Sequence, residues 1–273
     1  MRSAIFAIFV IAIAISLSYS AFVLERLTIS VSVDEKGVST VQEKAELLLT
    51  TPASTERYKS PLVKHDLATW REITGLTELR HHISGANVEM RGIRVRPQPP
   101  WRCNDFEGTC HAAILIDYVV YPLYANGTIL PNTGLFFAER FKPRTTRFTL
   151  NTKAITVGIS ESGDLVLDKI TNLTISIPQN SQNIYVQPLP QNEGKLTGAQ
   201  AFFWSNAILP KFEFSYEVEE SLESEVLEFF NSAQLSLQGA LLGAQGLALI
   251  VILIVIVSSY VYLNFVKGKN KER

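Results

Sequence analysis

The sequence predicts a mainly β protein: a β-sandwich-like ectodomain with one accessory helix, then a helical stalk and a single transmembrane helix. Short runs of alternating apolar and polar residues, separated by turn residues, recur from Leu27 to Val218. Many short strands of this kind favour a sandwich over a parallel sheet. Near the C-terminus no Asp, Glu, Lys or Arg occurs between Phe229 and Val266, which is longer than the roughly 20 apolar residues that cross a bilayer.

Segments near both ends of the chain predict the topology. Residues 1–20 carry Arg2 ahead of an apolar run and have the form of a secretory signal peptide, with an uncleaved signal anchor as the alternative. The predicted span covers residues 241–266. The tail, residues 267–273, holds four cations and one acid, which marks the cytoplasmic side. We therefore expect a type I single-pass protein of the plasma membrane or an equivalent secretory-pathway membrane, with its N-terminus outside and its C-terminus in the cytoplasm.

The exported part divides into a β-rich ectodomain and a stalk. Residues 21–240 hold 25 acids and 20 cations, and this negative balance argues against a general nucleic-acid binder. The ectodomain is expected at residues 21–218, with a weakly marked sub-boundary near residue 151. Apolar residues at helical spacing and a run of acids predict an acidic amphipathic stalk helix at residues 219–240.

The first elements of the ectodomain are a hairpin and a helix. Apolar residues alternate with Ser and Thr over residues 27–33, a turn ends at Gly37, and residues 38–49 return as the second strand. The helix is expected to begin with Ser60 as its N-cap and Pro61 at its first position, and to stop at Gly75. Apolar side chains, Trp70 among them, would lie on one face of this helix.

The remaining strands follow in order. A strand at residues 88–95 is expected to end at the prolines Pro97, Pro99 and Pro100, because proline lacks the N–H that a strand ladder uses. The other expected strands are residues 112–123, 135–141, 148–150, 154–159, 165–170, 173–177, 184–186, 201–204 and 212–218.

Cys103 and Cys110 are the chain's two cysteines, and both belong to the exported part. An oxidising exterior and an even count favour a disulfide, which would join the strands on either side into one hairpin. A metal site would need further ligands that His111 alone does not supply. The alternative is a pair of buried free thiols.

No histidine arrangement predicts a metal or catalytic site, so we expect no cofactor, no metal and no catalytic residue. Ordinary surface or core positions are favoured for His65, His81, His82 and His111, because none of them has the spacing of a metal motif. His65 and Asp66 with Glu72 would make half of an acid–base site, but no nucleophile motif accompanies them.

Five cations between residues 138 and 153 form a second candidate surface. Arg140, Lys142, Arg144, Arg147 and Lys153 are interleaved with aromatic residues, and outside the cell they would suit an anionic glycan, a lipid headgroup or an acidic partner. The alternative is a solvated strand pair whose aromatic residues point inward.

Two further patterns depend on the predicted topology. Asn126 and Asn172 begin Asn-x-Thr sequons and are glycosylation candidates, since both lie on the exported side. Gly239 and Gly243 form a small-xxx-small pattern at the entry to the span, which favours close helix packing. The alternative is that these glycines only end the stalk helix.

The opening hairpin at residues 27–43, the block at residues 173–178, Pro188, Trp204 and residues 212–218 resemble uncharacterised single-pass archaeal envelope proteins with β-rich ectodomains. The same outline is loosely similar to the luminal part of ribophorin-type subunits of oligosaccharyltransferase. No functional residue follows from either resemblance.

The expected function is binding or scaffolding at the outer membrane face, without enzymatic activity. The expected partners are the bilayer and either a protein partner or a second copy, which would associate through the stalk and span; nucleic acid is not expected. One alternative is an accessory subunit of a membrane-embedded glycosylation or translocation complex. A second is an ectoenzyme with a His-centred site.

Overall fold

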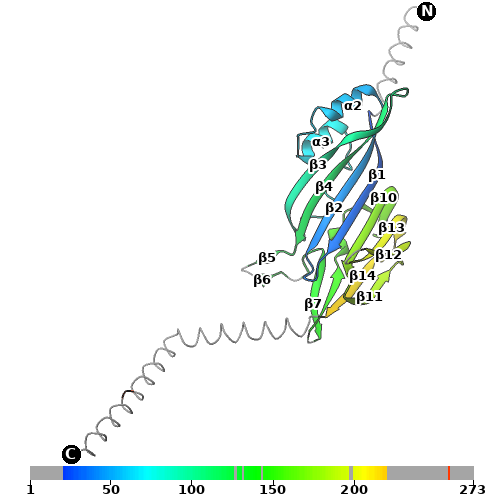
Figure 1. Ribbon diagram of the computed structural model, residues 1–273. Helices are drawn as coiled ribbons and strands as arrows, with labels where there is room; N and C mark the ends of the chain where they lie inside the picture. Colours follow the sequence, from blue (N-terminus) through cyan, green and yellow to red (C-terminus); the bar gives the residue numbers. More distant parts are fainter. Residues whose placement is uncertain are drawn as a thin grey trace, which may run out of the picture. The chain divides into compact units, whose positions relative to one another are not determined.

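A computed structural model describes residues 21–125, 128–130, 132–142, 144–196 and 199–219, together with Ser258. The described chain is mainly β, which confirms the predicted fold class at this level (Figure 1). Its elements are β1 (Phe22–Val33), β2 (Ser39–Leu49), α2 (Pro52–Lys59), α3 (Leu67–Thr74), β3 (Glu89–Asn104), β4 (Thr109–Tyr121), β5 (Tyr124–Ala125), β6 (Thr128–Ile129), β7 (Phe136–Lys142), β8 (Thr145–Leu150), a short 3₁₀ helix (Thr152–Ala154), β9 (Gly158–Ile159), β10 (Leu165–Pro178), β11 (Ser181–Gln187), β12 (Asn192–Leu196), β13 (Ala199–Leu209) and β14 (Glu213–Glu219).

The predicted opening hairpin is confirmed as β1 and β2. In the turn between them the Asp34 carboxylate accepts hydrogen bonds from the backbone N–H groups of Lys36 (2.9 Å) and Val38 (2.8 Å). Gly37 has φ of +79°, a backbone conformation that glycine adopts without a steric penalty. The alternation then places Ile29 and Val41 in the core, while the Ser and Thr residues between the apolar positions face outward.

The large sheet is mixed rather than purely antiparallel. Its strand order is β12-β13-β10-β1-β2-β4-β3, with β9 as an eighth strand beside β10. β1 runs parallel to β10, with Leu27 opposite Thr171. The two strands predicted at residues 165–170 and 173–177 are one strand, β10, whose register against β13 shifts between Leu167 and Asn172.

The accessory helix is replaced by two short helices, so the predicted start at Ser60 is wrong. Thr51 caps α2 and Ser60 ends it. α3 begins after Asp66, whose carboxylate accepts a hydrogen bond from the Thr69 N–H at 2.7 Å, and it ends at Gly75 with left-handed backbone, as predicted.

The three prolines do not break β3, contrary to the prediction. β3 lies at the end of the sheet order, so one side of its backbone has no strand partner within the described residues. Proline occurs on edge strands and at bulges, where a missing N–H disturbs the ladder least. The register against β4 shifts between Gln98 and Trp101, which absorbs the remaining distortion.

A second sheet, in the order β11-β14-β8-β7, contacts the first through aromatic rings. Phe214 lies 5.2 Å from Phe202 and 6.3 Å from Trp204 between ring centroids, and both contacts are edge-on. The buried residues form one cluster on both sides of Asn151, where a sub-boundary had been expected. Tyr58 of α2 and Trp70 of α3 belong to the same cluster, so these helices cover the same face of the large sheet.

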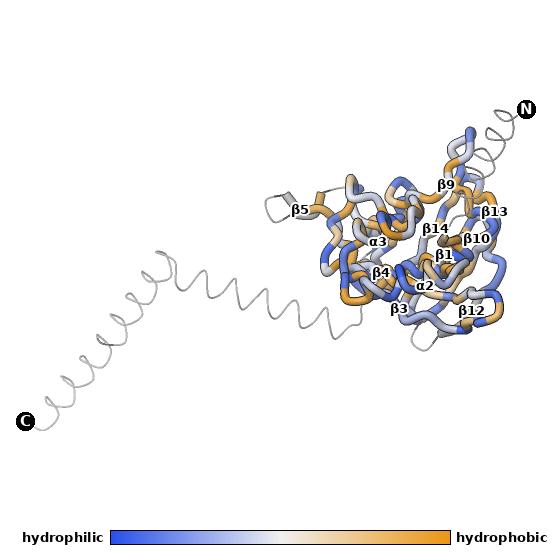
Figure 2. Tube along the Cα trace, turned by 90° about the horizontal axis from the view of Figure 1, so that it is seen from above, coloured by the Kyte–Doolittle hydropathy of each residue, from blue (hydrophilic) through white to orange (hydrophobic). Residues whose placement is uncertain are grey.

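Within the described residues no helix and no second sheet covers the opposite face of the large sheet, and we call it the outer face. On β1, β2 and β4 every second side chain is buried, and the side chains between them lie on the outer face. Hydrophobic and hydrophilic residues accordingly alternate along the trace (Figure 2). Most of these side chains are exposed or half-exposed: Thr28, Ser30, Ser32, Thr40, Gln42, Lys44, Glu46, His111, Leu115, Asp117, Val119 and Tyr121.

Within the described part of the chain, no helix is long and apolar enough to span a membrane. The predicted signal peptide, stalk, span and tail lie outside the described residues, except for Ser258 and for Glu219, the predicted first stalk residue, which ends β14.

Candidate functional site

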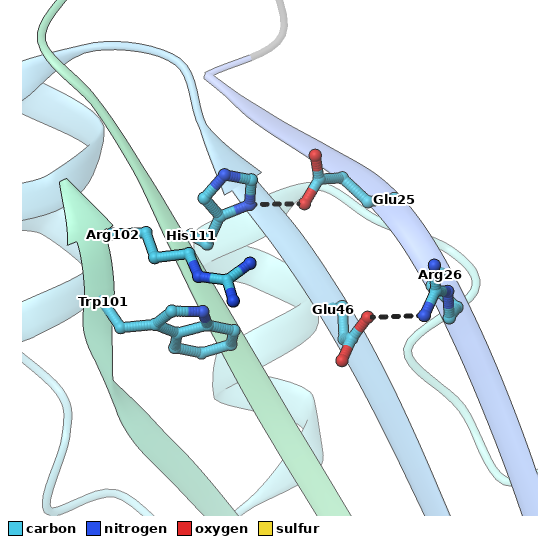
Figure 3. A pocket seen from close by; sticks show the side chains of 6 residues that line it. All are labelled: Glu25, Arg26, Glu46, Trp101, Arg102 and His111. Carbon is cyan, nitrogen blue, oxygen red and sulfur yellow. Dashed lines mark hydrogen bonds and ion pairs between the residues drawn. The ribbon is translucent and has the colours of Figure 1, made fainter. Parts of the chain in front are cut away.

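A candidate site lies on the outer face, near the start of β1. It is an open pocket of about 490 Å³ lined by six polar or aromatic side chains (Figure 3). Four neighbouring strands supply them: Glu25 and Arg26 from β1, Glu46 from β2, His111 from β4, and Trp101 and Arg102 from β3.

A β-bulge in β1 brings two charged residues to this pocket. The pairing of β1 with β2 shifts register between Leu24 and Arg26, so Glu25 is the extra residue. A bulge re-aims the side chains beside it. Glu25 and Arg26 are consecutive, yet both line the same pocket and both are exposed.

The two carboxylates of the pocket already have partners. Glu25 accepts a hydrogen bond from Nδ1 of His111 at 2.7 Å. Glu46 pairs with Nζ of Lys44 at 2.6 Å and lies 3.8 Å from the Arg26 guanidinium. Each pair is partly exposed, so each contributes at most about 1 kcal/mol to stability. Their main effect is to hold the side chains in place.

Trp101 and Arg102 are the pocket residues left open to a ligand. The Trp101 ring is stacked with that of His111, at 6.5 Å between centroids and 29° between planes. Arg102 is exposed, has φ of +48° and makes no hydrogen bond or ion pair with any described residue. A guanidinium without an internal partner next to an indole is equipped to hold an anionic group against a flat ring.

The disulfide holds this corner together. Cys103 and Cys110 are bonded, as predicted, with their Cα atoms 4.0 Å apart. The bond joins the end of β3 to the start of β4, where Trp101 lies opposite His111 in the ladder. The predicted hairpin between these two strands is thus confirmed. The bridge therefore fixes the geometry of Trp101, Arg102 and His111.

The other histidines have structural contacts. His65 Nδ1 lies 3.0 Å from the Val95 carbonyl oxygen. His82 is buried and meets Glu43 twice, through its backbone N–H at 2.8 Å and through Nδ1 at 2.7 Å. In the described residues no group of three or more His, Cys, Asp or Glu side chains is arranged to hold a metal ion.

Glu43 is the centre of a buried polar cluster that the sequence analysis missed. It is fully buried on β2 and also accepts a hydrogen bond from the Tyr118 hydroxyl. Burial, together with the charge of Glu43, raises the pKa of Tyr118, so the hydroxyl stays protonated and donates. Burial lowers the pKa of His81, whose ring lies edge-on to Tyr118 at 5.2 Å. The cluster ties the segment before β3 to the sheet.

Two of the five cations in the basic segment at residues 138–153 pair with acids of β14. Arg147 pairs with Glu217 at 2.6 Å, and Arg144 lies 3.7 Å from Glu219. Phe148 is buried, as the alternative of a strand pair with inward aromatic residues predicted. Hydrogen bonds from Asn183 and Arg147 lower the pKa of Glu217. This segment is less open to a ligand than the pocket.

The remaining predicted sites are placed as follows. Asn172 lies within β10, half-exposed and opposite Thr28 of β1. Asn126, Gly239 and Gly243 lie outside the described residues. Glycosylation of the two asparagines and packing through the two glycines stay predictions.

Comparison of the chain with known protein families and with curated proteins finds no match. The resemblance to archaeal envelope proteins therefore stays a prediction, and the functional argument depends on the pocket itself. Sequence reasoning did not find the pocket. The available signal was Trp101-Arg102 directly before a disulfide cysteine, with charged residues at outward positions of the first hairpin.

Proposed function

We propose that this chain is a type I single-pass membrane protein whose β-rich ectodomain acts as a binding or scaffolding module at the outer membrane face. The ligand site is the pocket on the outer face of the large sheet. One observation carries the proposal: an arginine that makes no hydrogen bond or ion pair with a described residue lies beside a tryptophan whose ring stacks on His111, in a pocket where Glu25 and Glu46 already have partners. Concave sites with a few converging polar groups are the usual places for ligands.

The membrane anchorage rests on the sequence. The charge-free stretch ending at Val266 supports a span, and the basic tail supports a cytoplasmic C-terminus. A reporter fused after Arg273 is expected in the cytoplasm, and an epitope inserted after Asn126 is expected to react with antibody on intact cells. Reaction of the tail reporter from outside would refute this topology.

The binding role is tested by comparing two aromatic variants of the full-length protein. Trp101→Ala removes the ring of the pocket, whereas Tyr185→Ala removes a half-exposed ring on β11 of the other sheet. Both proteins are purified from native membranes in mild detergent, and the co-purifying material is quantified. We expect Trp101→Ala to lose material that wild type and Tyr185→Ala retain. Equal recovery in all three would refute the pocket as the binding site.

A further inference from the structure

The edge strand β3 carries a row of cations onto the same face as the pocket. Arg94 lies opposite Asp117, Arg96 opposite Leu115 and Trp101 opposite His111. Residues directly opposite each other in a ladder have side chains on the same face, and these β4 residues occupy the outer face. The row from residue 94 to residue 102 extends for about 25 Å at the usual rise of a strand.

The acids on this face already have hydrogen-bonded or ion-pair partners, whereas two of its arginines have none among the described residues. The Asp117 carboxylate binds the Arg96 guanidinium at 2.6 Å and the Gln42 amide at 2.7 Å. Glu46 and Glu25 are engaged as described above. Arg94, like Arg102, is exposed and makes no hydrogen bond or ion pair with a described residue. The surplus donors at both ends of the row favour a ligand with repeated negative charge.

The backbone of β3 argues against an extended peptide as the ligand. Peptides that bind along a sheet edge add a strand through backbone hydrogen bonds. Pro97, Pro99 and Pro100 remove three N–H groups from this stretch of the edge strand. Recognition must therefore come from side chains on the face, which combine an indole ring, guanidinium groups and many hydroxyl and amide groups.

A sugar acid matches these groups. The C–H face of a pyranose ring carries slight positive charge and packs on the negative face of an indole. A carboxylate on the same sugar accepts two parallel hydrogen bonds from one guanidinium. Ser30, Thr28 and Gln42 on the neighbouring strands offer hydroxyl and amide partners for further sugar hydroxyls. A neutral sugar would leave the cations without a partner, and a simple anion would leave the ring unused.

We propose that the outer face of the large sheet binds an anionic polysaccharide of uronic-acid type, with one sugar stacked on Trp101, its carboxylate held by Arg102, and the chain continuing along β3 past Arg96 toward Arg94. This proposal rests on the proposed function and names its ligand class.

The test uses the full-length protein in detergent and probes that separate charge from ring. Polygalacturonate carries both features, its fully methyl-esterified form keeps the ring without the charge, and poly-L-glutamate keeps the carboxylates without the ring. A single-stranded oligodeoxythymidylate represents an anionic polymer with flat bases. Binding is measured by titration calorimetry at low salt and repeated at higher salt, where an electrostatic contribution weakens.

We expect polygalacturonate to bind more tightly than the other three probes. Arg102→Gln and Trp101→Ala should each weaken that binding about tenfold or more, since losing a hydrogen bond to a charged group or a stacked ring is worth at least that factor. The matched controls are Arg71→Gln, an exposed arginine on α3, and Tyr185→Ala; both should bind as wild type. Near-ultraviolet circular dichroism checks that each variant is folded.

Four outcomes would overturn the proposal. These are equal affinity for the esterified polymer, equal or tighter binding of polyglutamate, equal or tighter binding of the oligonucleotide, and unchanged affinity in Arg102→Gln. If no probe binds while co-purification still depends on Trp101, the ligand class is wrong and the proposed function stands. If co-purification is also independent of Trp101, the proposed function fails as well.

Discussion

Replacing the buried Glu43 is expected to destabilise the ectodomain more than any single change at the pocket. Its carboxylate accepts hydrogen bonds from the His82 backbone, the His82 ring and the Tyr118 hydroxyl. Glu43→Ala leaves all three donors buried without an acceptor. Each buried donor left without an acceptor costs about 1 to 3 kcal/mol, and Glu43→Ala orphans three of them. We therefore expect a loss of about 4 kcal/mol or more in the free energy of unfolding.

Two milder variants separate the contributions of the Glu43 charge and of the Tyr118 hydrogen bond to this loss. Glu43→Gln keeps the shape but turns one oxygen into an NH₂ group that faces a donor, so a loss of about 1 to 3 kcal/mol is expected. Tyr118→Phe removes one donor and leaves the carboxylate its His82 contacts, with an expected loss of about 1 to 2 kcal/mol. Gln42→Ala, on the same strand but facing outward, is the matched control and should cost less than about 1 kcal/mol.

The assay is urea unfolding of the full-length protein in detergent, followed by tryptophan fluorescence. Hydrogen exchange at the His82 amide gives a second, local readout, because this N–H donates to Glu43 and should exchange faster in Glu43→Ala. A loss no larger than that of Gln42→Ala would refute the reasoning. So would unchanged exchange at His82, because it would show that the segment before β3 is held by other contacts.

Three further predictions concern the turns, the disulfide and pH. Gly37→Ala should cost about 2 to 3 kcal/mol, because its φ is +79° and the new Cβ would lie 2.6 Å from a buried aromatic ring; Gly163→Ala, with φ of +86° and open space, should cost about 1 kcal/mol. Replacing Cys103 and Cys110 by serine should cost about 2.5 kcal/mol from loop entropy. Because the pKa of Glu217 is lowered below the ordinary 4.5, its stabilising contribution is present above that pH and is lost as pH falls, so Glu217→Gln should flatten the acid limb of the stability profile.

Each of these has a result that would contradict it. Equal losses of unfolding free energy in Gly37→Ala and Gly163→Ala would show that the Phe148 ring moves aside without destabilising the fold. Two separately alkylated thiols in the unreduced wild type would remove the basis for the disulfide prediction. A Glu217→Gln variant whose unfolding midpoint falls with acid as steeply as wild type would place the acid sensitivity in other carboxylates.

The sequence predicts several local elements correctly, but it does not predict which strands pair in the sheet. Alternation in the opening hairpin, Gly75 as a helix stop and the cysteine pair each depend on residues close in the chain, and the structure agrees with all three. The predicted helix start was wrong because Ser60 and Asp66 are both good N-caps, and residue propensity alone does not choose between them. Glu43 interrupts an apolar series at an inward position, which was a signal for a buried polar cluster.

The pocket could not be predicted from the sequence, because it depends on which strands are neighbours. Its residues come from four strands and become neighbours only through the order β3-β4-β2-β1 and through the bulge at Glu25. The period of two is the same in parallel and antiparallel strands, so it reveals neither strand order nor register. For the same reason the parallel pairing of β1 with β10 could not be anticipated.

That parallel pairing has a consequence for biogenesis. β1 is made long before β10, yet one of its edges is completed only when β10, whose Thr171 lies opposite Leu27, has been synthesised. Until then the new hairpin exposes an unsatisfied strand edge, which is a template for pairing with other chains. Contacts so distant in sequence also form slowly. If the chain is exported as proposed, it needs protection by a chaperone during its emergence, and chains released before residue 165 should aggregate rather than fold.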